Sequence, residues 1–321
     1  MNALPFFQNI KNALTAGGTG GLTWHLHAAR SRSNWTDTHS QIEEHLFKGL
    51  KKWTSSVILS SNHSGTKGQL QLVLIGASAG WMMSSRWLQA FNEIDAYDID
   101  PLAPLLFRLN HGKALQQKGV NLRFHNLDAI DQLDRVLAKH PNALIWFDNV
   151  LGQHRIRLKD SDLASTHLKI LQRRLKGRFW GSVHDLYSGP VQSGPLQSDQ
   201  LQKGQQQDSG QINFGDKKNS NLSHSPARVS ADVVRLDHSD QDNARVMFNQ
   251  QESTLGQARQ QFLQKLGATA GSGAWLDHET SKVFPVGTEL KWTGWDFKTG
   301  YCHCLEMGWS DGLKAKTLNS I

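Results

Sequence analysis

The sequence predicts an α/β fold in three layers, in which a mostly parallel sheet carries helices on both faces and a C-terminal antiparallel hairpin closes the sheet. Two observations lead to this prediction. Short apolar segments alternate with amphipathic segments between residues 69 and 187, and their short connections require parallel strands joined by crossover helices. Two aromatic-rich segments, 289–295 and 301–307, then flank a short loop that contains Gly300, which is typical of a β-hairpin.

The individual elements follow from hydrophobic spacing and from helix start and stop signals. A capping box from Thr38 to Gln41 precedes apolar residues at helical spacing, which predicts a helix over about 39–53 that packs on the sheet. Gly177 ends another amphipathic segment that begins at Ser161. The expected strands are 70–75, a segment ending at 98, 121–125, 143–150 and 178–185, and the expected helices are 81–91, 102–117, 131–139, 161–176 and 255–266.

A change in composition divides the chain. Residues 188–243 are dominated by Gln, Ser, Gly, Asn and Asp, which is too polar a composition to offset the entropy of ordering and predicts a low-complexity insertion. Residues 1–68 form a predicted N-terminal helical extension, and residues 69–187 together with 244–321 form the predicted core domain. Within the extension, residues 24–27 either dock on the core or reach over a ligand site as a lid.

Composition also narrows the class of protein. With 321 residues, 38% of them hydrophobic, the chain can bury a sizeable core. No apolar run has the length of a signal-peptide core or of a membrane span, so we expect a cytoplasmic protein without a membrane partner. The net charge of +7 permits an anionic partner, but the eight basic residues within 155–178 lack interleaved aromatic residues and fit a solvated helix face. Nucleic acid is therefore the less favoured partner.

The two cysteines indicate neither a disulfide nor a metal site. Cys302 and Cys304 flank His303, a sequence that is similar to a metal-ligand cluster. A zinc site needs about four ligands, however, and successive residues of a strand point to opposite faces. We expect an ordinary strand with free thiols and no bound metal.

The most informative segment is the strand over 70–75 and the glycine-rich turn that follows it. Gly76 and Gly80 let the backbone turn tightly and approach a ligand before the next helix begins. Asp98 stands 22 residues after Gly76, at the end of the next apolar segment, where α/β folds of this kind hold a ribose diol. Together these features predict a site for a nucleotide-type cofactor.

The same turn also reads Gly76-x-Ser78-x-Gly80, the pattern of the nucleophile elbow of serine hydrolases. The segment before the first strand predicts helices and contains no oxyanion loop of the His-Gly-Gly-Gly type. A hydrolase would also leave Asp98 without an explanation. Serine hydrolysis by Ser78 is therefore the weaker alternative.

Over residues 70–307, apart from the polar insertion, the pattern resembles the class I S-adenosylmethionine-dependent methyltransferases, whose catalytic domain is Rossmann-like. The resemblance implies S-adenosylmethionine as the cofactor and a methyl acceptor that it does not identify. The charge pattern favours a small molecule or a protein over nucleic acid as that acceptor. It implies cofactor-binding roles for Gly76, Ser78 and Gly80 in the loop, Asp98 at the ribose, Asp128 beside the adenine, and Asn149 after the fourth strand.

The chain departs from that family at two positions of the loop. Leu74 stands where family members usually carry an acidic residue, and Ser78 stands in place of the middle glycine. The segment 148–153, Asp-Asn-Val-Leu-Gly-Gln, does not match the motif of amino-group methylation and identifies no acceptor. These departures leave open a second function, that of a non-catalytic protein that uses the fold to bind a partner.

Methyl transfer needs a base only when the acceptor must lose a proton, so little catalytic motif is expected. Four residues near the carboxyl ends of strands are candidates, because open α/β sheets place their sites there. Asp148 and His184 are the first candidates for a catalytic role, followed by His154 and Asp185.

Overall fold

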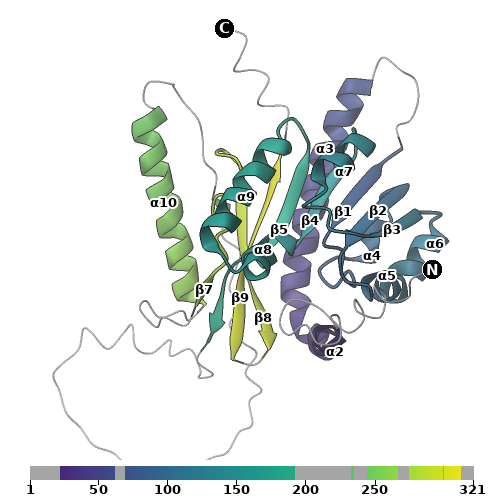
Figure 1. The fold of residues 1–321 in the computed structure, drawn as a ribbon, viewed down its shortest axis with the longest axis horizontal. Helices are drawn as coiled ribbons and strands as arrows, with labels where there is room; N and C mark the ends of the chain where they lie inside the picture. Colours follow the sequence, from purple (N-terminus) through teal and green to yellow (C-terminus); the bar gives the residue numbers. More distant parts are fainter. Residues whose placement is uncertain are drawn as a thin grey trace, which may run out of the picture.

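A mixed sheet of nine strands forms the centre of the part of the chain that the structure describes, which is residues 22–61, 69–191, 233–234, 244–266, 275–298 and 300–311 of a computed structural model (Figure 1). The strands lie in the order β3-β2-β1-β4-β5-β9-β8-β6, and β7 pairs separately with β5. Their bounds are β1 (Gln71–Ile75), β2 (Glu93–Asp98), β3 (Asn121–Asn126), β4 (Leu144–Asp148), β5 (Trp180–Pro190), β6 (Val233–Val234), β7 (Leu276–Asp277), β8 (Leu290–Lys298) and β9 (Tyr301–Ser310).

Strand direction confirms the predicted fold class. The five strands from β3 to β5 are parallel to their neighbours, while β9 runs antiparallel to both β5 and β8. The β8–β9 hairpin therefore closes the parallel part of the sheet, as the aromatic segments predict. The result is a mostly parallel sheet with a C-terminal antiparallel hairpin.

Helices cover both faces of this sheet and complete the three layers (Figure 1). Alternate residues of β1 supply two separate hydrophobic clusters: Leu72 and Leu74 contact α3 and α4 on one face, and Val73 and Ile75 belong to the cluster under α7 and α9 on the other. The helical elements are α2 (Leu22–Ser31), η1 (Arg32–Trp35), α3 (Thr36–Ser61), α4 (Ser85–Leu88), α5 (Ala103–Phe107), η2 (Arg108–Gly112), α6 (Lys113–Gln117), α7 (Leu133–Lys139), α8 (Val150–Leu158), α9 (Ser161–Arg174) and α10 (Ala244–Lys265).

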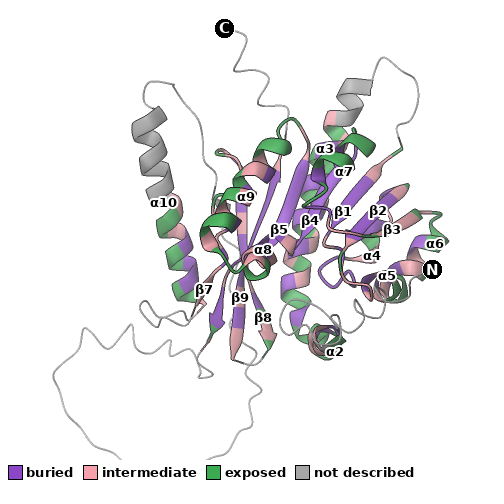
Figure 2. Ribbon diagram, viewed as in Figure 1, coloured by how far each residue is buried: buried purple, intermediate pink, exposed green. Residues whose placement is uncertain are grey.

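The register of the central strands brings their carboxyl ends to one edge. Ile75 of β1 lies opposite Tyr97 of β2 and Phe147 of β4, so the residues that follow these strands are neighbours in space. The central strands are buried on both faces, as Figure 2 shows, and this burial holds that edge rigid.

Several elements differ from the sequence expectation. Helix α3 has the predicted buried face, with Ile42 and Leu46 fully buried, but it is longer than 39–53. The helix expected over 81–91 is reduced to α4, because residues 81–83 lie buried in turns. Helix α2 lies within the predicted N-terminal helical extension. Helix α8 is not predicted, because its sequence, which contains Gly152, has no regular apolar face.

Strand β5 continues past the predicted boundary of the core domain, since it ends at Pro190 and Ser188 is buried. The rest of the predicted insertion lies outside the described residues, except for 191 and β6.

Cys302 and Cys304 are buried free thiols, and no group of metal-ligating side chains occurs among the described residues. None of the described helices is both long and apolar enough to cross a membrane.

Candidate functional site

The turn after β1 adopts a backbone conformation that alternates between ordinary and left-handed residues. Gly76, Ser78 and Gly80 have φ angles of 76°, 47° and 70°. Glycine adopts such angles freely, whereas a serine does so at a cost of about 1 kcal/mol. Ser78 therefore takes the conformation of the glycine that it replaces in the predicted loop.

Gly76 also allows the turn to approach the end of β4. A side chain added at this position would place its Cβ 2.6 Å from Cβ of Val150 and 3.0 Å from the carbonyl oxygen of Asp148. The backbone N–H of Gly76 donates to the carbonyl of Tyr97 at 2.9 Å, which ties the turn to β2 as well. The turn is thus fixed between the ends of the two neighbouring strands.

The π-helical turn η2 supports the far side of the same loop. Asn110 donates through Nδ2 to the carbonyl of Ala79 at 2.7 Å, and His111 donates through Nε2 to the carbonyl of Gly80 at 3.0 Å. Burial lowers the pKa of His111, so its ring is neutral, and Nδ1 can accept from the hydroxyl of Ser85 at 2.8 Å. A π-helical turn beside a ligand loop is a frequent feature of functional sites.

Asp98 lies against the loop, as its position in the sequence predicts. Its Oδ2 accepts a hydrogen bond from the backbone N–H of Ser78 at 2.7 Å, and its Oδ1 accepts from the N–H of Asp100 at 2.8 Å. Burial raises the pKa of Asp98 to about 6. Each carboxylate oxygen retains a second lone pair, so the group can still accept from a ligand.

Helix α2 reaches the same turn through Asp100. Trp81 donates through Nε1 to Nδ1 of His25 at 3.2 Å, so Nε2 of His25 carries the proton and donates to Oδ2 of Asp100 at 2.9 Å. Helix α2 has a second attachment on β8. Trp24 stacks on Phe297, and Nε2 of His27 lies 2.9 Å from the carbonyl oxygen of Phe297. Helix α2 therefore connects the Asp98–Asp100 turn to the tip of the hairpin.

Asp148 ends β4 beside the glycine loop and is 7% exposed. Its Oδ1 has no hydrogen-bond partner among the described residues, and no described ion pair involves its carboxyl group. Burial, with a smaller contribution from the nearby charge of Asp98, raises the pKa of Asp148 to about 7. Burying a charged carboxylate without a hydrogen-bond partner lowers the stability of the fold. Such groups are frequent in ligand-binding sites, where a ligand supplies the missing partner.

Asn149 follows Asp148 in a left-handed conformation and connects it to β5. Its Oδ1 accepts from the backbone N–H of Asp185 at 2.9 Å, and its Nδ2 lies 3.3 Å from Oδ2 of the same residue. The opposite oxygen of Asp185 accepts from Nδ1 of His303 at 2.9 Å. The structure thus brings Asn149 and Asp185 together and adds His303, which the sequence does not single out as a catalytic residue.

The remaining predicted residues have other partners. Asp128 accepts hydrogen bonds from the N–H groups of Ile130 and Asp131 at 3.0 and 3.2 Å and forms an ion pair with Arg157. An adenine-binding role for Asp128 stays a prediction, since this ion pair already engages one oxygen of the carboxylate.

His184 is fully buried beneath the hairpin rather than beside the loop. Its Nδ1 lies 3.0 Å from the hydroxyl of Ser182, and its Nε2 lies 3.6 Å from Oε1 of Glu306, a carboxylate that also binds Arg259. These contacts are those of a packing residue, and its catalytic role stays a prediction. His154 is likewise buried, with Nε2 3.3 Å from Nδ1 of His167.

The geometry around Ser78 gives no support to serine hydrolysis. A nucleophilic serine needs a histidine within hydrogen-bond reach of its hydroxyl. In the described part of the chain, the hydrogen bond of Ser78 is made by its backbone N–H to Asp98, and no histidine contacts its side chain.

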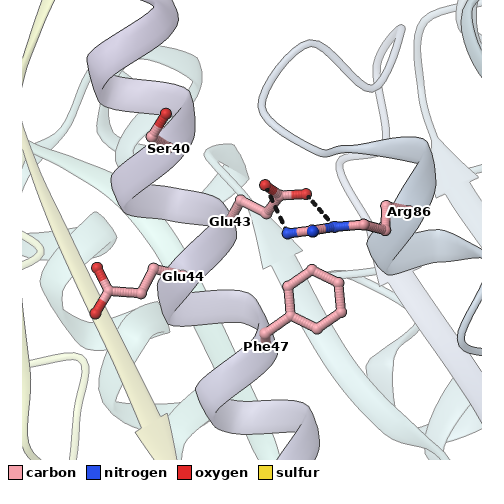
Figure 3. A pocket seen from close by; sticks show the side chains of 5 residues that line it. All are labelled: Ser40, Glu43, Glu44, Phe47 and Arg86. Atoms are coloured by element: carbon pink, nitrogen blue, oxygen red, sulfur yellow. Dashed lines mark hydrogen bonds and ion pairs between the residues drawn. The ribbon is translucent and has the colours of Figure 1, made fainter.

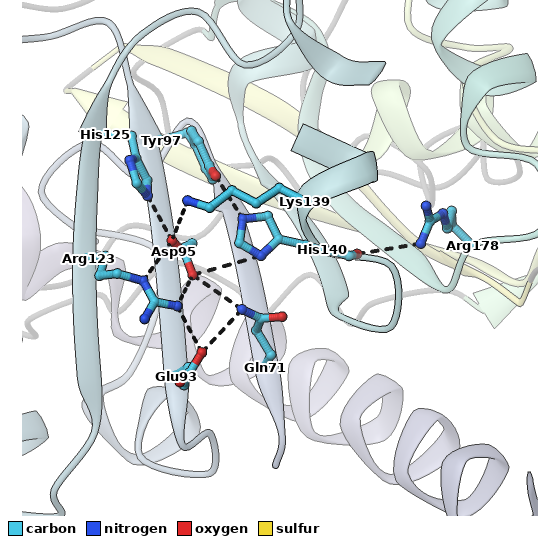
Figure 4. Close-up of polar contacts among 9 residues, drawn as sticks. All are labelled: Gln71, Glu93, Asp95, Tyr97, Arg123, His125, Lys139, His140 and Arg178. Carbon is cyan, nitrogen blue, oxygen red and sulfur yellow. Dashed lines mark hydrogen bonds and ion pairs between the residues drawn. The ribbon is translucent and has the colours of Figure 1, made fainter. Parts of the chain in front are cut away.

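A second charged cluster lies in the middle of β2 and β3, away from their carboxyl ends (Figure 4). Asp95 is fully buried and accepts hydrogen bonds from Arg123 at 2.6 Å and from His125 at 2.7 Å. Burial alone would raise the pKa of Asp95, but these two donors outweigh burial and hold the pKa well below its usual range. Because every charge in the cluster has a partner, we assign it a structural role.

An open groove between α3 and α4 is lined by Ser40, Glu43, Glu44, Phe47 and Arg86 (Figure 3). Glu43 and Arg86 form an ion pair at 3.1 Å across this groove, and the Arg86 guanidinium lies over the ring of Phe47. These side chains satisfy one another, so the groove offers no unpaired group to a ligand.

No protein-family model matches the chain, and no curated protein matches its sequence. Solved structures that match parts of it include a magnesium protoporphyrin IX methyltransferase from Synechocystis with bound S-adenosylmethionine, at 18% identity and a TM-score of 0.26 over 44% of this chain and 62% of that one.

Two other matches are an O-methyltransferase family protein from Burkholderia thailandensis and an S-adenosylmethionine-dependent methyltransferase from Clostridium acetobutylicum. The first has 11% identity and a TM-score of 0.25 over 47% of this chain and 41% of that one. The second has 15% identity and a TM-score of 0.25 over 42% and 50%. The chain thus spans less than two thirds of each of these structures, and the fold assignment depends on the strand order described above.

Proposed function

We propose that this protein is an S-adenosylmethionine-dependent methyltransferase. The observation that supports the proposal is the group of three features at one edge of the sheet: a loop with three left-handed residues, Asp98 hydrogen-bonded to that loop, and the buried carboxyl group of Asp148 next to it, whose Oδ1 has no hydrogen-bond partner among the described residues. A turn that contains glycines lets the backbone approach a ligand closely, and an acid after the second strand suits a ribose. Serine hydrolysis does not explain all three features.

The residues around Asp98 suit the nucleoside half of the cofactor. The second lone pairs of its carboxylate oxygens can accept from the two ribose hydroxyls. Ile99, the next residue, is 52% exposed and offers an apolar surface beside this turn. We assign Ile99 the apolar surface on which the adenine packs.

The residues around Asp148 suit the cationic half. The cofactor carries a sulfonium and an ammonium group, and Leu74 leaves the chain without the acid that usually stands in the first strand. Asp148 supplies a carboxylate at the end of the adjacent strand, with Oδ1 free among the described residues. A cationic group of the cofactor would then offset the free-energy cost of burying the negative charge of Asp148.

S-adenosylmethionine supplies an electrophilic methyl group, and the protein has to position the acceptor in line with it. We assign the acceptor to the region beyond the carboxyl end of β4. Helix α2 borders this region, because His25 binds Asp100 after β2 and His27 contacts Phe297 on β8. Exclusion of water and orientation of the acceptor are therefore the tasks of these elements.

Calorimetry with S-adenosylmethionine, S-adenosylhomocysteine and methylthioadenosine tests the cofactor assignment. We expect binding of all three, with the amino acid end of the first two adding affinity over methylthioadenosine. NADH is the matched control ligand, because it shares the adenosine but lacks the sulfur and the amino acid. Binding of NADH alone, or of none of these ligands, would contradict the proposal.

The non-catalytic alternative is favoured by the two departures at Leu74 and Ser78. Such a protein would keep the fold in order to bind a partner or a ligand, without catalysis. Incubation with methyl-labelled S-adenosylmethionine and fractionated cell extract separates the two functions: label in an acceptor fraction supports the enzyme, and cofactor binding without any transfer supports the binding protein.

A further inference from the structure

A buried Asp–His pair lies beside the proposed cofactor site. Nδ1 of His303 lies 2.9 Å from Oδ1 of Asp185, and because a carboxylate can only accept, the ring nitrogen is the donor. Asp185 is fully buried, and its Oδ2 accepts from Nε2 of Gln153 at 3.0 Å and from Nδ2 of Asn149 at 3.3 Å. A carboxylate held by two amides fixes the orientation of the third group that it binds.

The contact also fixes the tautomer of His303. With the proton held on Nδ1, the lone pair of the neutral ring is on Nε2. No hydrogen bond among the described residues engages Nε2, and the side chain is 13% exposed. Burial alone would raise the pKa of Asp185, but the interactions of its carboxylate with His303, His278 and Asn149 outweigh burial and hold the pKa below its ordinary value. The pair therefore combines a permanent carboxylate with an imidazole that can accept a proton.

Aromatic rings surround the imidazole. The ring centroids of Trp295, Phe297 and Tyr301 lie 5.0, 5.4 and 5.4 Å from that of His303. The titratable or charged groups around it are Asp185 on β5, Tyr301 on β9, Lys298 on β8 over the Tyr301 ring, and His27 on α2 against Phe297. A substrate beside His303 would contact these aromatic rings and the lone pair on Nε2 of His303.

We propose that His303 is the general base of the methyl transfer, that Asp185 is its positioning residue, and that the acceptor is an aromatic compound with a phenolic hydroxyl. The inference rests on the proposed methyltransferase function. A phenol has an ordinary pKa of about 10, so at neutral pH its oxygen needs a base in order to attack. The aromatic surroundings suit the ring of such an acceptor.

The step balances without another reactant. The hydroxyl proton passes to Nε2 of His303 as the phenol oxygen forms its bond to the methyl carbon, and the sulfur keeps the electron pair of the bond that breaks. Asp185 stabilises the imidazolium that results, and the proton then leaves to solvent. The products are a methyl ether and S-adenosylhomocysteine.

The test uses the full-length protein, methyl-labelled S-adenosylmethionine, and a panel of phenols and catechols compared with tertiary amines and thioethers, which need no base. We expect transfer to the phenolic panel only, reduced about 100-fold or more in His303→Ala. Added imidazole should restore part of that rate, which a purely structural loss would not allow. His167→Gln on α9 is the control histidine variant and should retain the rate.

Asp185→Asn separates positioning from folding. It should move the acid limb of the rate profile to lower pH, because the imidazolium loses its carboxylate partner. Calorimetry with S-adenosylhomocysteine runs in parallel on each variant. If cofactor binding is intact but the parent transfers methyl to no phenol, or His303→Ala keeps its rate, the inference is overturned while the cofactor assignment stands. If the parent binds no cofactor, the proposed function fails first.

Discussion

Oδ2 of Asp98 accepts a hydrogen bond of 2.7 Å from the backbone N–H of Ser78. This bond joins the end of β2 to the middle of the glycine loop, so the acid that would hold a ribose and the backbone that would approach the ligand are fixed relative to each other. Pre-organisation of this kind reduces the entropy lost when a ligand binds.

Replacing Asp98 by alanine should weaken the binding of S-adenosylhomocysteine by one to two orders of magnitude, because hydrogen bonds to a charged acceptor contribute about 1.5 to 3 kcal/mol. Some stability should be lost too, since the bonds to Ser78 and Asp100 disappear. Calorimetry measures the affinity, with the exposed Asp131→Ala as the control. Equal affinity in Asp98→Ala and the parent would remove Asp98 from the site.

Gly76→Ala should destabilise the fold more than Gly119→Ala. Both glycines have φ near +70°, at 76° and 68°, so both variants carry the cost of a left-handed alanine. Only at Gly76 would the new Cβ also meet Val150, whereas nothing lies within 4 Å at Gly119. Urea denaturation should give a loss of about 1 kcal/mol for Gly119→Ala and a clearly larger loss for Gly76→Ala. Equal losses would show that the loop can move away from β4.

Asp148→Asn should stabilise the protein at alkaline pH. The folded-state pKa of Asp148 is about 7, above its ordinary value of 3.8, so the folded chain binds a proton that the unfolded chain releases. The carboxyl group therefore lowers stability progressively as pH rises from 3.8 to about 7, and the full penalty remains at higher pH. Thermal unfolding should show Asp148→Asn above the parent at pH 8, by at most a few kcal/mol, with the difference shrinking toward pH 4. A variant less stable than the parent at pH 8 would mean that the charged form already has a partner.

Asp95→Asn should cost about 1 kcal/mol or more, because Arg123 and His125 lose a fully buried carboxylate partner. Both partners are partly exposed and Arg123 keeps its ion pair with Glu93, so solvent reduces the cost. The folded pKa of Asp95 is depressed, so its contribution is present above pH 3.8 and is lost as pH falls below that value. Denaturation at pH 7 and at pH 3 checks both statements: the difference between variant and parent should be smaller at pH 3 than at pH 7, but much of it should remain at pH 3, because the folded-state pKa of Asp95 lies well below its ordinary value. The cofactor affinity should not change, since the cluster lies away from the loop.

Local patterns account for the parts of the site that the sequence predicts. Gly76, Gly80 and Asp98 are visible because a strand, a turn and an acid follow one another at fixed spacing, and the fold class is visible for the same reason. His303 and Asp185 are separated by 118 residues, and they meet because β9 pairs with β5 across a bulge between Asp185 and Tyr187. No local signal gives the position of a bulge, so sequence patterns alone do not predict this pair.

His184 is a residue that the sequence suggests for the site but that the structure places elsewhere. Its place near the end of a predicted strand makes it a candidate base, yet alternation along β5 turns it to the face where Glu306 lies. The face of a strand residue follows from the pairing register, which the sequence of β5 does not contain by itself. Asn110 and His111 are similar, because the π-helical turn that aims them at the loop has no sequence signature here.

Helix α2 has a consequence for the order in which the molecule is assembled on the ribosome. His25 binds Asp100, 75 residues further along the chain, and His27 contacts Phe297, which is 270 residues away. The helix is synthesised early, but its second attachment does not exist until the hairpin has emerged. A contact of this kind raises the mean sequence separation of native contacts, which is typical of proteins that fold more slowly. A nascent chain can form the glycine loop long before it has a complete site.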